Sequence, residues 1–162
     1  MSLSIRQATA EDTAVVAEFN RLLALESEGI HLDQATLNVG VRACLEDPIK
    51  GRYFLAEEAG LVIGQLCLTF EFSDWRNGWM WWIQSVYVRP EARRRGVFSA
   101  LFAHVEGLAR NDPEVIGLRL YMERDNETAR QTYLRHGMRP TGYVLFEKYP
   151  LGDDAAGVLK RD

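Results

Sequence analysis

The amino-acid sequence predicts an α+β fold, in which a mixed central sheet of six to seven strands is combined with about four helices. The first observation behind this prediction is the order of hydrophobic periods along the chain, which reads βααβββαβαβ. The second is a run of three strands joined by short turns, which is typical of antiparallel pairing. The third is a strand-to-helix crossover after those strands.

Each element follows from a local pattern. Strands are expected at residues 3–8, 52–57, 61–72, 79–88, 116–122 and 138–147, and helices at residues 10–28, 33–45, 96–110 and 126–136. The first helix begins at residues 9–12, which have the form of a capping box. Residues 65–72 alternate as a strand with two unlike faces, and the next strand ends before Pro90, which cannot donate to a ladder. Residues 97–108 place apolar side chains on one helical face, and Gly137 is typical of a helix end.

Composition is that of an ordinary globular protein and argues against several functional classes. The 162 residues are 47% hydrophobic and 26% charged, which predicts a single domain over residues 1–150 and a frayed tail over residues 151–162. The net charge of −4 argues against nucleic acid or an anionic membrane as a partner. Two cysteines and three scattered histidines predict neither a disulfide framework nor a metal site. No stretch approaches the ~20 apolar residues of a membrane span, and no signal-like segment is visible, so a cytoplasmic protein is expected.

The strongest functional feature is the junction between the strand that ends near Val88 and the helix that opens at Gly96. The loop between them carries Arg93, Arg94 and Arg95. A helix N-terminus offers unpaired N–H groups and the positive end of a dipole, which together bind anions such as phosphate. Each arginine at a helix start is unfavourable by ~0.3–1 kcal/mol because its charge opposes that dipole, whereas a bound anion would reverse this effect. A loop that is only solvated is therefore the less favoured interpretation. A nucleic-acid phosphate contact remains open, while the absence of G-x-G-x-x-G argues against a dinucleotide-binding turn.

Residues 93–98, Arg-Arg-Arg-Gly-Val-Phe, resemble the Arg/Gln-x-x-Gly-x-Gly/Ala signature of the GNAT acetyltransferase superfamily. The resemblance extends over residues 3 to about 148 and implies the layered α/β/α acyl-CoA N-acyltransferase fold, with acetyl-CoA as co-substrate. It implies that the loop binds the CoA pyrophosphate through Arg93, Arg94, Arg95, Gly96, Val97, Phe98 and Ser99. Phe98 departs from the signature, because the family usually has glycine or alanine there, and we interpret it as a variant of the signature. The preceding strand, at Val86, Tyr87 and Val88, is implied to pair with the pantetheine chain.

A second element lies about thirty residues further along the chain. Residues 126–138 resemble the family pattern Asn-x-x-Ala-x-x-x-Tyr-x-x-x-Gly-Phe, with methionine in place of the phenylalanine. Asn126, Ala129 and Tyr133 share one helical face. By resemblance, Asn126 and Ala129 contact the pantetheine chain, and Tyr133 is the catalytic acid. Taken alone, the same residues read as an N-cap and a core aromatic.

These features predict an N-acetyltransferase that moves the acetyl group of acetyl-CoA directly to a primary amine of a small molecule or peptide. An amine with a pKa of ~10.4 costs about 4–5 kcal/mol to deprotonate at pH 7, so the site must supply a base or a dry environment. The family often places a glutamate on the strand before the arginine loop. The comparable residue here is Gln84, which cannot take a proton. Glu28, Glu71 or Glu123 could act through water, and Glu28, Gln84 and Tyr143 are candidate substrate contacts.

Two other functions stay open on the sequence. Gln84 permits a catalytically silent module that binds acetyl-CoA and releases no thiol. The three arginines permit nucleic-acid binding, which the net charge of −4 opposes. The acceptor amine and the oligomeric state are also open, although a strand edge or the tryptophan-rich hairpin at residues 75–82 could join two copies as a homodimer.

Overall fold

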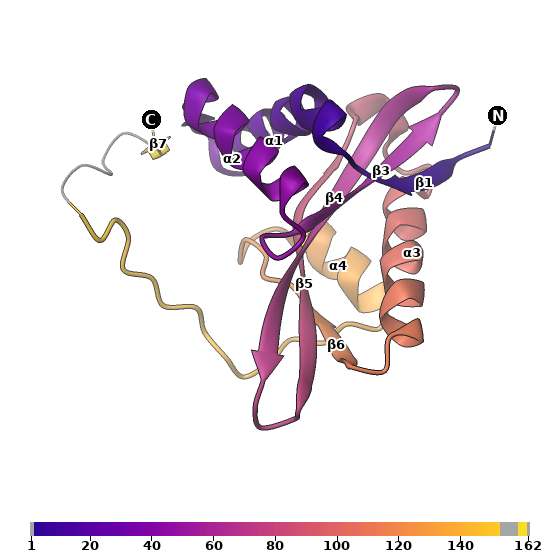
Figure 1. Ribbon diagram of the computed structural model, residues 1–162, viewed down its shortest axis with the longest axis vertical. Helices are drawn as coiled ribbons and strands as arrows, with labels where there is room; N and C mark the ends of the chain where they lie inside the picture. The colour runs from indigo at the N-terminus through magenta and orange to yellow at the C-terminus, as the bar shows by residue number, and fades with distance from the viewer. Residues whose placement is uncertain (1, 153–158, 162) are drawn as a thin grey trace.

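Five strands form a mixed central sheet in the computed structural model, which describes residues 2–152 and 159–161. The elements are, in order, β1 (Ser4–Gln7), η1 (Ala10–Asp12), α1 (Thr13–Glu28), β2 (Ile30–Leu32), α2 (Gln34–Glu46), β3 (Arg52–Glu58), β4 (Leu61–Ser73), β5 (Gly78–Val88), η2 (Pro90–Ala92), α3 (Val97–Asn111), β6 (Val115–Arg119), α4 (Glu127–Arg135) and β7 (Leu159–Arg161). The sheet order is β1-β3-β4-β5-β6. Neighbouring strands are antiparallel except β5 and β6, which are parallel, as the crossover through α3 requires (Figure 1).

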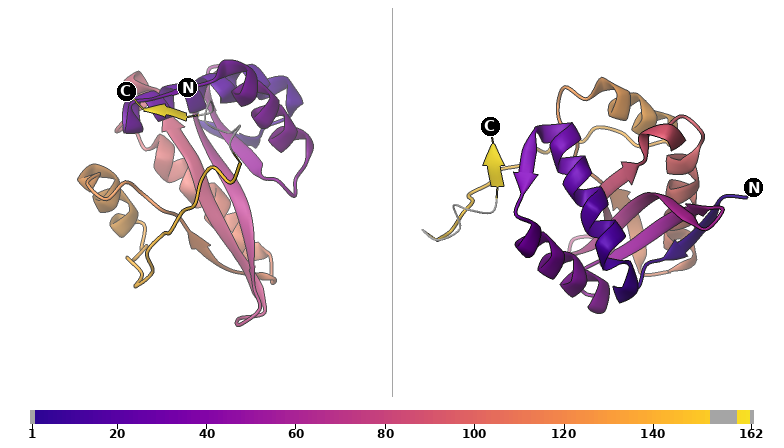
Figure 2. Two further views of the ribbon diagram at one scale, coloured as in Figure 1. Left: turned by 90° about the vertical axis from the view of Figure 1, so that its left-hand side faces the viewer. Right: turned by 90° about the horizontal axis from the view of Figure 1, so that it is seen from above.

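Helices cover both faces of this sheet (Figures 1 and 2). On one face, Leu101 and Val105 of α3 are buried against side chains of β3, β4 and β5. On the other face, Val16 of α1 and Val41 of α2 pack on the buried Leu55 of β3. The predicted α+β fold with α/β/α layers is therefore confirmed. Within the described ranges, no helix is long and apolar enough to cross a bilayer.

The predicted helix ends have the expected caps. The Thr9 N–H donates to Asp12 Oδ2 at 2.8 Å in a capping box, which lies at η1, the short 3-10 helix that leads into α1. α1 ends at Gly29 and α4 is followed by Gly137, with φ values of 65° and 78° respectively. This left-handed backbone is readily adopted by glycine and ends a helix. Between α1 and α2 the chain adds the short strand β2, which the sequence pattern does not reveal.

β5 contains a bulge near its centre. Its pairing with β4 passes from Gln84–Cys67 directly to Tyr87–Gln65, so two residues of β5 face one residue of β4. One of the two, Ser85, has a φ of 49°, a left-handed value that is uncommon outside glycine. Bulges of this kind re-aim side chains and often lie beside functional sites.

β5 and β6 separate before β5 ends. Their parallel pairing runs from Trp79–Val115 to Trp82–Arg119 and stops there, although β5 continues to Val88. We call the opening between residues 83–88 and the chain after Arg119 the fork. Along the fork, β5 has no strand on its outer edge among the described residues.

The predicted last strand, residues 138–147, is not a strand. Residues 138–150 have no regular secondary structure, and the outer part of this segment runs away from the sheet (Figures 1 and 2). The central sheet therefore has five strands rather than six to seven, beside a separate pair of β2 with β7. An extended segment becomes a strand only when its backbone pairs, which this one does not do. The expected frayed tail, residues 151–162, lies largely outside the described residues.

Candidate active site

The loop that joins β5 to α3 presents a row of free amide groups. Arg94 and Gly96 have left-handed backbone, with φ values of 61° and 82°, which turns the chain into α3. Among the described residues, the amides of residues 94–99 have no hydrogen-bond acceptor. A side chain added at Gly96 would meet no atom within 4 Å, so the space beside Gly96 is open. The loop has the geometry of an anion site at a helix N-terminus.

The three arginines of this loop have different partners. Arg93 pairs with Glu26 of α1 and donates from Nε to a carbonyl of β5 at 2.9 Å. Arg95 pairs with Glu58 at 2.8 Å. Arg94 forms no ion pair or hydrogen bond with any residue that the structure describes. Exposed ion pairs contribute only about 0–1 kcal/mol, so a pyrophosphate can compete for these guanidinium groups.

Phe98, the residue that departs from the family signature, does not cover the loop. Its ring lies between α3 and α4, with centroid distances of 5.7 Å to Tyr133 and 5.3 Å to His136. Beside it, Ser99 Oγ lies 3.1 Å from His136 Nε2. The phenylalanine therefore packs α4 against the first turn of α3 and leaves the amides free.

The segment expected to pair with the pantetheine chain lies along the fork. Val86 and Val88 are half-buried, and Tyr87 is buried against Phe19 of α1, with ring centroids 4.9 Å apart. The Tyr87 hydroxyl donates to Glu26 at 3.2 Å, and burial raises the pKa of Tyr87. Because β6 does not pair with β5 here, the outer main-chain groups of this segment can bond an extended ligand.

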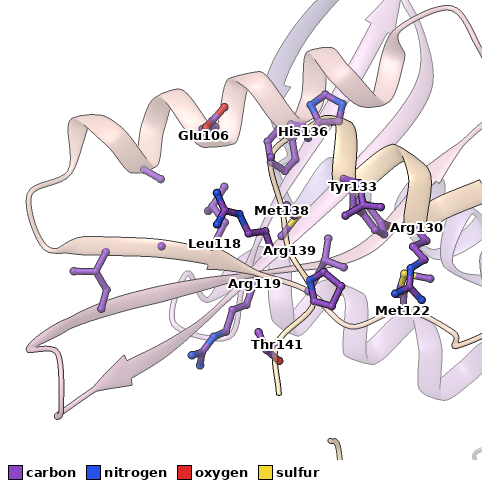
Figure 3. Close-up of a pocket in the computed structure, with 18 of the residues that line it drawn as sticks. Glu106, Leu118, Arg119, Met122, Arg130, Tyr133, His136, Met138, Arg139 and Thr141 are labelled. Atoms are coloured by element: carbon purple, nitrogen blue, oxygen red, sulfur yellow. The ribbon is translucent and has the colours of Figure 1, made fainter. Parts of the chain in front are cut away.

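α4 carries the second predicted motif. The Asn126 side chain accepts a hydrogen bond from the Ala129 N–H at 3.0 Å, so Asn126 caps the helix. Tyr133 is half-buried, and burial raises the pKa of Tyr133 above its usual value. Its hydroxyl has no hydrogen-bond partner in the part of the chain described here. Figure 3 shows Tyr133 reaching from α4 beside Met122 and Arg130, at the edge of a cavity of about 690 Å³.

The candidate substrate contacts come together only in part. Gln84 Nε2 donates to Thr69 Oγ1 at 3.2 Å. The Tyr143 ring is exposed, and its centroid lies 6.0 Å from the Arg119 guanidinium. Glu28 is the exposed last residue of α1, and no hydrogen bond or ion pair joins it to another described residue.

Arg119, which sequence reasoning missed, is the centre of a cluster at the fork. Its guanidinium lies 6.0 Å from the Trp82 ring, 6.0 Å from the Tyr143 ring, and donates to Glu71 at 2.9 Å. Tyr121 packs on Trp82 with centroids 6.2 Å apart. We call Arg119, Trp82, Tyr121 and Tyr143 the Arg119 cluster. Trp82 and Arg119 are the last pair before the fork, so the cluster marks the point where the strands separate.

A buried polar network, also missed, supports the bulge of β5. Gln65 is fully buried and donates from Nε2 to Asn20 Oδ1 at 2.7 Å and to the Ser85 carbonyl at 3.1 Å. Asn20 in turn donates to the Tyr53 hydroxyl at 2.9 Å. Gln65 Oε1 has no partner among the described residues. In a strand of alternating residues, a polar residue such as Gln65 suggests that its face of the sheet is exposed to solvent. Here that face is covered by α1, so the sequence pattern did not reveal the network.

Glu26 and His136 are two further residues that sequence reasoning did not single out. Glu26 reaches Arg93 and Tyr87 from α1, and His136 reaches Ser99 from the end of α4. Both contacts join elements that are distant in the sequence, and neither residue stands in a motif. The roles of Glu26 and His136 can be recognised only after the helices have been packed on the sheet, because the contacts form only there.

Comparison with known proteins assigns the family. Residues 16–138 match the acetyltransferase (GNAT) family. The chain is 33% identical over 141 residues to an aminoalkylphosphonate N-acetyltransferase from Salmonella typhimurium, and the alignment covers 86% of each protein. These matches favour an enzyme over a silent binding module.

Solved structures agree with this assignment. The crystal structure of a possible acetyltransferase from Clostridium difficile 630 is 39% identical and superposes with a TM-score of 0.87, covering 94% of this chain and 100% of that one. A predicted acetyltransferase from Clostridium acetobutylicum, crystallised with acetyl-CoA, shares the fold at 18% identity and a TM-score of 0.75, over 91% and 96% of the two chains. The chain thus belongs to the acetyltransferase (GNAT) family and is an N-acetyltransferase that uses acetyl-CoA as its co-substrate.

Proposed function

We propose that the acceptor is a small primary amine that also carries an acidic group, of the aminoalkylphosphonate type. The observation that carries this proposal is the Arg119 cluster, which places a guanidinium and three aromatic rings where β5 and β6 separate. Glu71 accepts from one nitrogen of Arg119, and a guanidinium has five donors, so others are left for a phosphonate. The relative from Salmonella typhimurium is named for acetylating such amines.

The proposed binding surface for acetyl-CoA has two parts. The amides of residues 94–99, with Arg93, Arg94 and Arg95, hold the pyrophosphate, because the same loop carries free N–H groups and three arginines whose ion pairs are exposed. The main-chain groups of residues 86–88 bond the pantetheine chain along the fork. Capping uses only the side-chain oxygen of Asn126, so its amide nitrogen is left to donate to the pantetheine, while Ala129 leaves space beside it.

Tyr133 is proposed to donate a hydrogen bond to the departing sulfur. A phenol has a pKa of ~10 and a thiol one of ~8.5, so full proton transfer from tyrosine is uphill by about 2 kcal/mol. Burial raises the pKa of Tyr133 further, which favours hydrogen bonding over proton loss. A backbone N–H beside the bulge, near Val86, is proposed to donate a hydrogen bond to the carbonyl oxygen of the thioester.

The proton on the acceptor amine leaves through water in this proposal. Gln84 cannot take it, and Glu71 is bonded to Arg119. Glu28 and Glu123 are exposed, so water can reach each of them. Attack of the neutral amine then gives the amide and the free thiol of CoA.

A thiol-release assay across four amines tests the acceptor class. We expect the highest kcat/KM with 2-aminoethylphosphonate, and lower values with propylamine, a polyamine and a short peptide with a free N-terminus. Arg119→Ala should raise the KM for the phosphonate about 10- to 150-fold, because a charge-assisted hydrogen bond contributes about 1.5–3 kcal/mol. The KM for propylamine should stay unchanged.

Arg110→Ala is the matched control, since Arg110 of α3 is exposed and pairs with Glu106 within its own helix. Equal turnover of propylamine and the phosphonate, or an equal loss with every amine in Arg119→Ala, would reject the acidic acceptor. Preferred turnover of the peptide would instead assign a peptide amine.

We also propose that residues 1–150 act as one catalytic domain and that the protein works in the cytoplasm. The family match over residues 16–138 supports the first part, because it spans the arginine loop and α4 together. Expression of residues 1–150 alone, followed by the same assay, tests it, and a complete loss of fold would contradict it. Fractionation of the source cells tests the location.

A further inference from the structure

The two cysteines of the chain lie together on the side of the sheet that α1 and α2 cover. Cys44 belongs to α2 and Cys67 to β4. Cys67 is part of the buried cluster on this side, and Cys44 packs against that cluster. Neither thiol takes part in the proposed acetyl transfer, so the pair is a nucleophilic feature that still needs a role.

Gly51 shows how near to each other the two sulfur atoms lie. It is buried between α2 and β3, and a methyl group added to it would lie 2.8 Å from Cys44 Sγ and 3.3 Å from Cys67 Sγ. A contact as short as the first forces the sulfur to move, because the interior is closely packed. Both sulfur atoms therefore border one small space, which glycine leaves to them. A disulfide needs two sulfur atoms that can approach each other closely, and a shared space permits that approach.

The two thiols differ in their access to solvent. Cys67 is 3% exposed, and its thiol donates to the Leu68 carbonyl at 3.7 Å. Cys44 is half-buried and helps to line a cavity of about 280 Å³ between α1, α2 and β3. A water molecule takes up about 30 Å³, and a small hydroperoxide is little larger, so the cavity can admit one. Cys44 therefore meets an oxidant first, and Cys67 reacts through Cys44.

The neighbouring thiols also differ in acidity. Cys67 lowers the pKa of Cys44, whereas Cys44 and burial raise the pKa of Cys67. Cys44 thus loses its proton first, and the thiolate is the form that attacks an oxidant. An accessible thiolate beside a second thiol is the usual arrangement of cysteines that are oxidised reversibly.

We propose that Cys44 and Cys67 form a site of reversible oxidation, at which a hydroperoxide joins them as a disulfide between α2 and β4. First, the Cys44 thiolate attacks one peroxide oxygen, so that an S–O bond forms and the O–O bond breaks. The Cys44 sulfur is oxidised to a sulfenic acid, and the other oxygen is reduced and leaves, with a proton, as water or an alcohol. Then the Cys67 sulfur attacks Cys44 Sγ, and the S–S bond replaces the S–O bond. The departing hydroxide takes the Cys67 proton and becomes water.

The disulfide has two consequences for the protein. It removes the sulfenic acid before a second hydroperoxide converts it to a sulfinic acid, which thiols cannot reduce. It also ties α2 to the central sheet and so restricts the unfolded chain. A thiol reductant restores both cysteines by exchange. This inference does not depend on the identity of the acceptor amine or on acetyl transfer.

Mass spectrometry of the unaltered protein provides the first test and needs no variant. The reduced protein is treated briefly with hydrogen peroxide and then unfolded in N-ethylmaleimide, which labels any thiol that remains. We expect the loss of two hydrogen atoms, no label, and a digest product that joins residues 44 and 67. Dithiothreitol should restore both thiols. A disulfide between two chains, or a sulfinic acid at Cys44 beside an unoxidised Cys67, overturns the proposal.

Two serine variants separate the steps and serve as controls for each other. Cys67→Ser keeps the accessible thiol without its partner, so peroxide should leave a sulfenic acid at Cys44, which dimedone traps. Cys44→Ser should leave Cys67 unmodified, because the buried thiol meets no oxidant. Oxidation of Cys67 in Cys44→Ser as fast as in the unaltered protein contradicts the proposed order of attack.

Thermal unfolding measures how firmly the bond ties α2 to the sheet. The oxidised protein should melt about 5–10 °C above the reduced protein, and Cys44→Ser should show no such rise. No rise in the oxidised unaltered protein contradicts the tie.

The space beside Gly51 is tested by alanine. Gly51→Ala should slow disulfide formation, because its methyl group would press on both sulfur atoms. Gly142→Ala is the matched control, since a side chain there would meet no atom within 4 Å. Circular dichroism confirms that both variants are folded, and equal rates in the two folded proteins contradict the shared space on which the proposal rests. The peroxide experiment on the unaltered protein decides the proposal if Gly51→Ala does not fold.

Discussion

Replacing Tyr133 by phenylalanine removes one hydroxyl and leaves its surroundings almost intact. The ring would keep its place 5.7 Å from the Phe98 ring, and no described residue would lose a hydrogen bond. Because burial raises the pKa of Tyr133, the phenol is protonated and can donate throughout the neutral range. The substitution therefore isolates the proposed hydrogen bond to the departing sulfur.

The expected effect on turnover follows from the strength of that bond. A hydrogen bond to a charged group contributes about 1.5–3 kcal/mol. At ~1.36 kcal/mol per factor of ten, its loss should lower kcat by about 10- to 150-fold. The bond gains strength only as charge develops on sulfur, so the affinity for acetyl-CoA should hardly change.

Thiol release measured with a chromogenic disulfide gives kcat, and calorimetry gives the affinity for acetyl-CoA. Tyr149→Phe, which removes a hydroxyl from an exposed tyrosine outside the candidate site, is the control and should behave like the parent. Equal kcat for Tyr133→Phe and the parent would refute the proposed role. A fall in affinity as large as the fall in kcat would mean that Tyr133 supports the binding site and does not assist the reaction.

Three further predictions concern single side chains. Glu26→Gln removes the carboxylate that pairs with Arg93, so acetyl-CoA should bind more tightly, by up to about 5-fold for a pair worth ~1 kcal/mol; weaker binding by calorimetry would contradict this. Gln65→Ala leaves buried groups unpaired and opens a cavity, so the free energy of unfolding should fall by about 2–4 kcal/mol, and an unchanged denaturation midpoint would argue against the network. The neighbouring Cys67 thiol lowers the pKa of Cys44 to about 7, so the thiolate is present above that pH. Alkylation of Cys44 followed by mass spectrometry should accelerate through pH ~7, while the buried Cys67 stays unmodified; a midpoint near ~8.5 would contradict the shift.

The elements set by local periodicity were predictable, and those set by a partner were not. The hairpin of β3 and β4 and the helix α3 follow from alternation and from one apolar face. Residues 138–147 have equally good strand character. Whether they form a strand depends on whether their backbone pairs with the edge of a sheet, and the local sequence does not contain that information. For the same reason the short pair of β2 and β7 was not foreseen.

The candidate site divides in a similar way. The arginine loop at residues 93–99 is continuous in sequence, so its motif revealed it. The Arg119 cluster depends on the register of β5 against β6, which brings Trp82 opposite Arg119. At the end of α1, sequence reasoning selected Glu28, whereas Glu26 makes the contacts. Two residues turn a helix by about 200°, so neighbouring glutamates face opposite sides and only the packed helix decides between them.

The extra residue in β5 changes which layer each later side chain serves. Ahead of Ser85, the odd-numbered Ile83 is buried in the α3 layer; past it, the even-numbered Val88 packs there. Tyr87, odd-numbered like Ile83, turns instead to Phe19 on the α1 side. A strict two-residue alternation would have pointed that phenol at the wrong helix. The alternation of side chains between the two faces of β5 is therefore shifted by one residue at the bulge. A design that assigns residues to faces from the N-terminal end of β5 must include this one-residue shift for every position beyond Ser85.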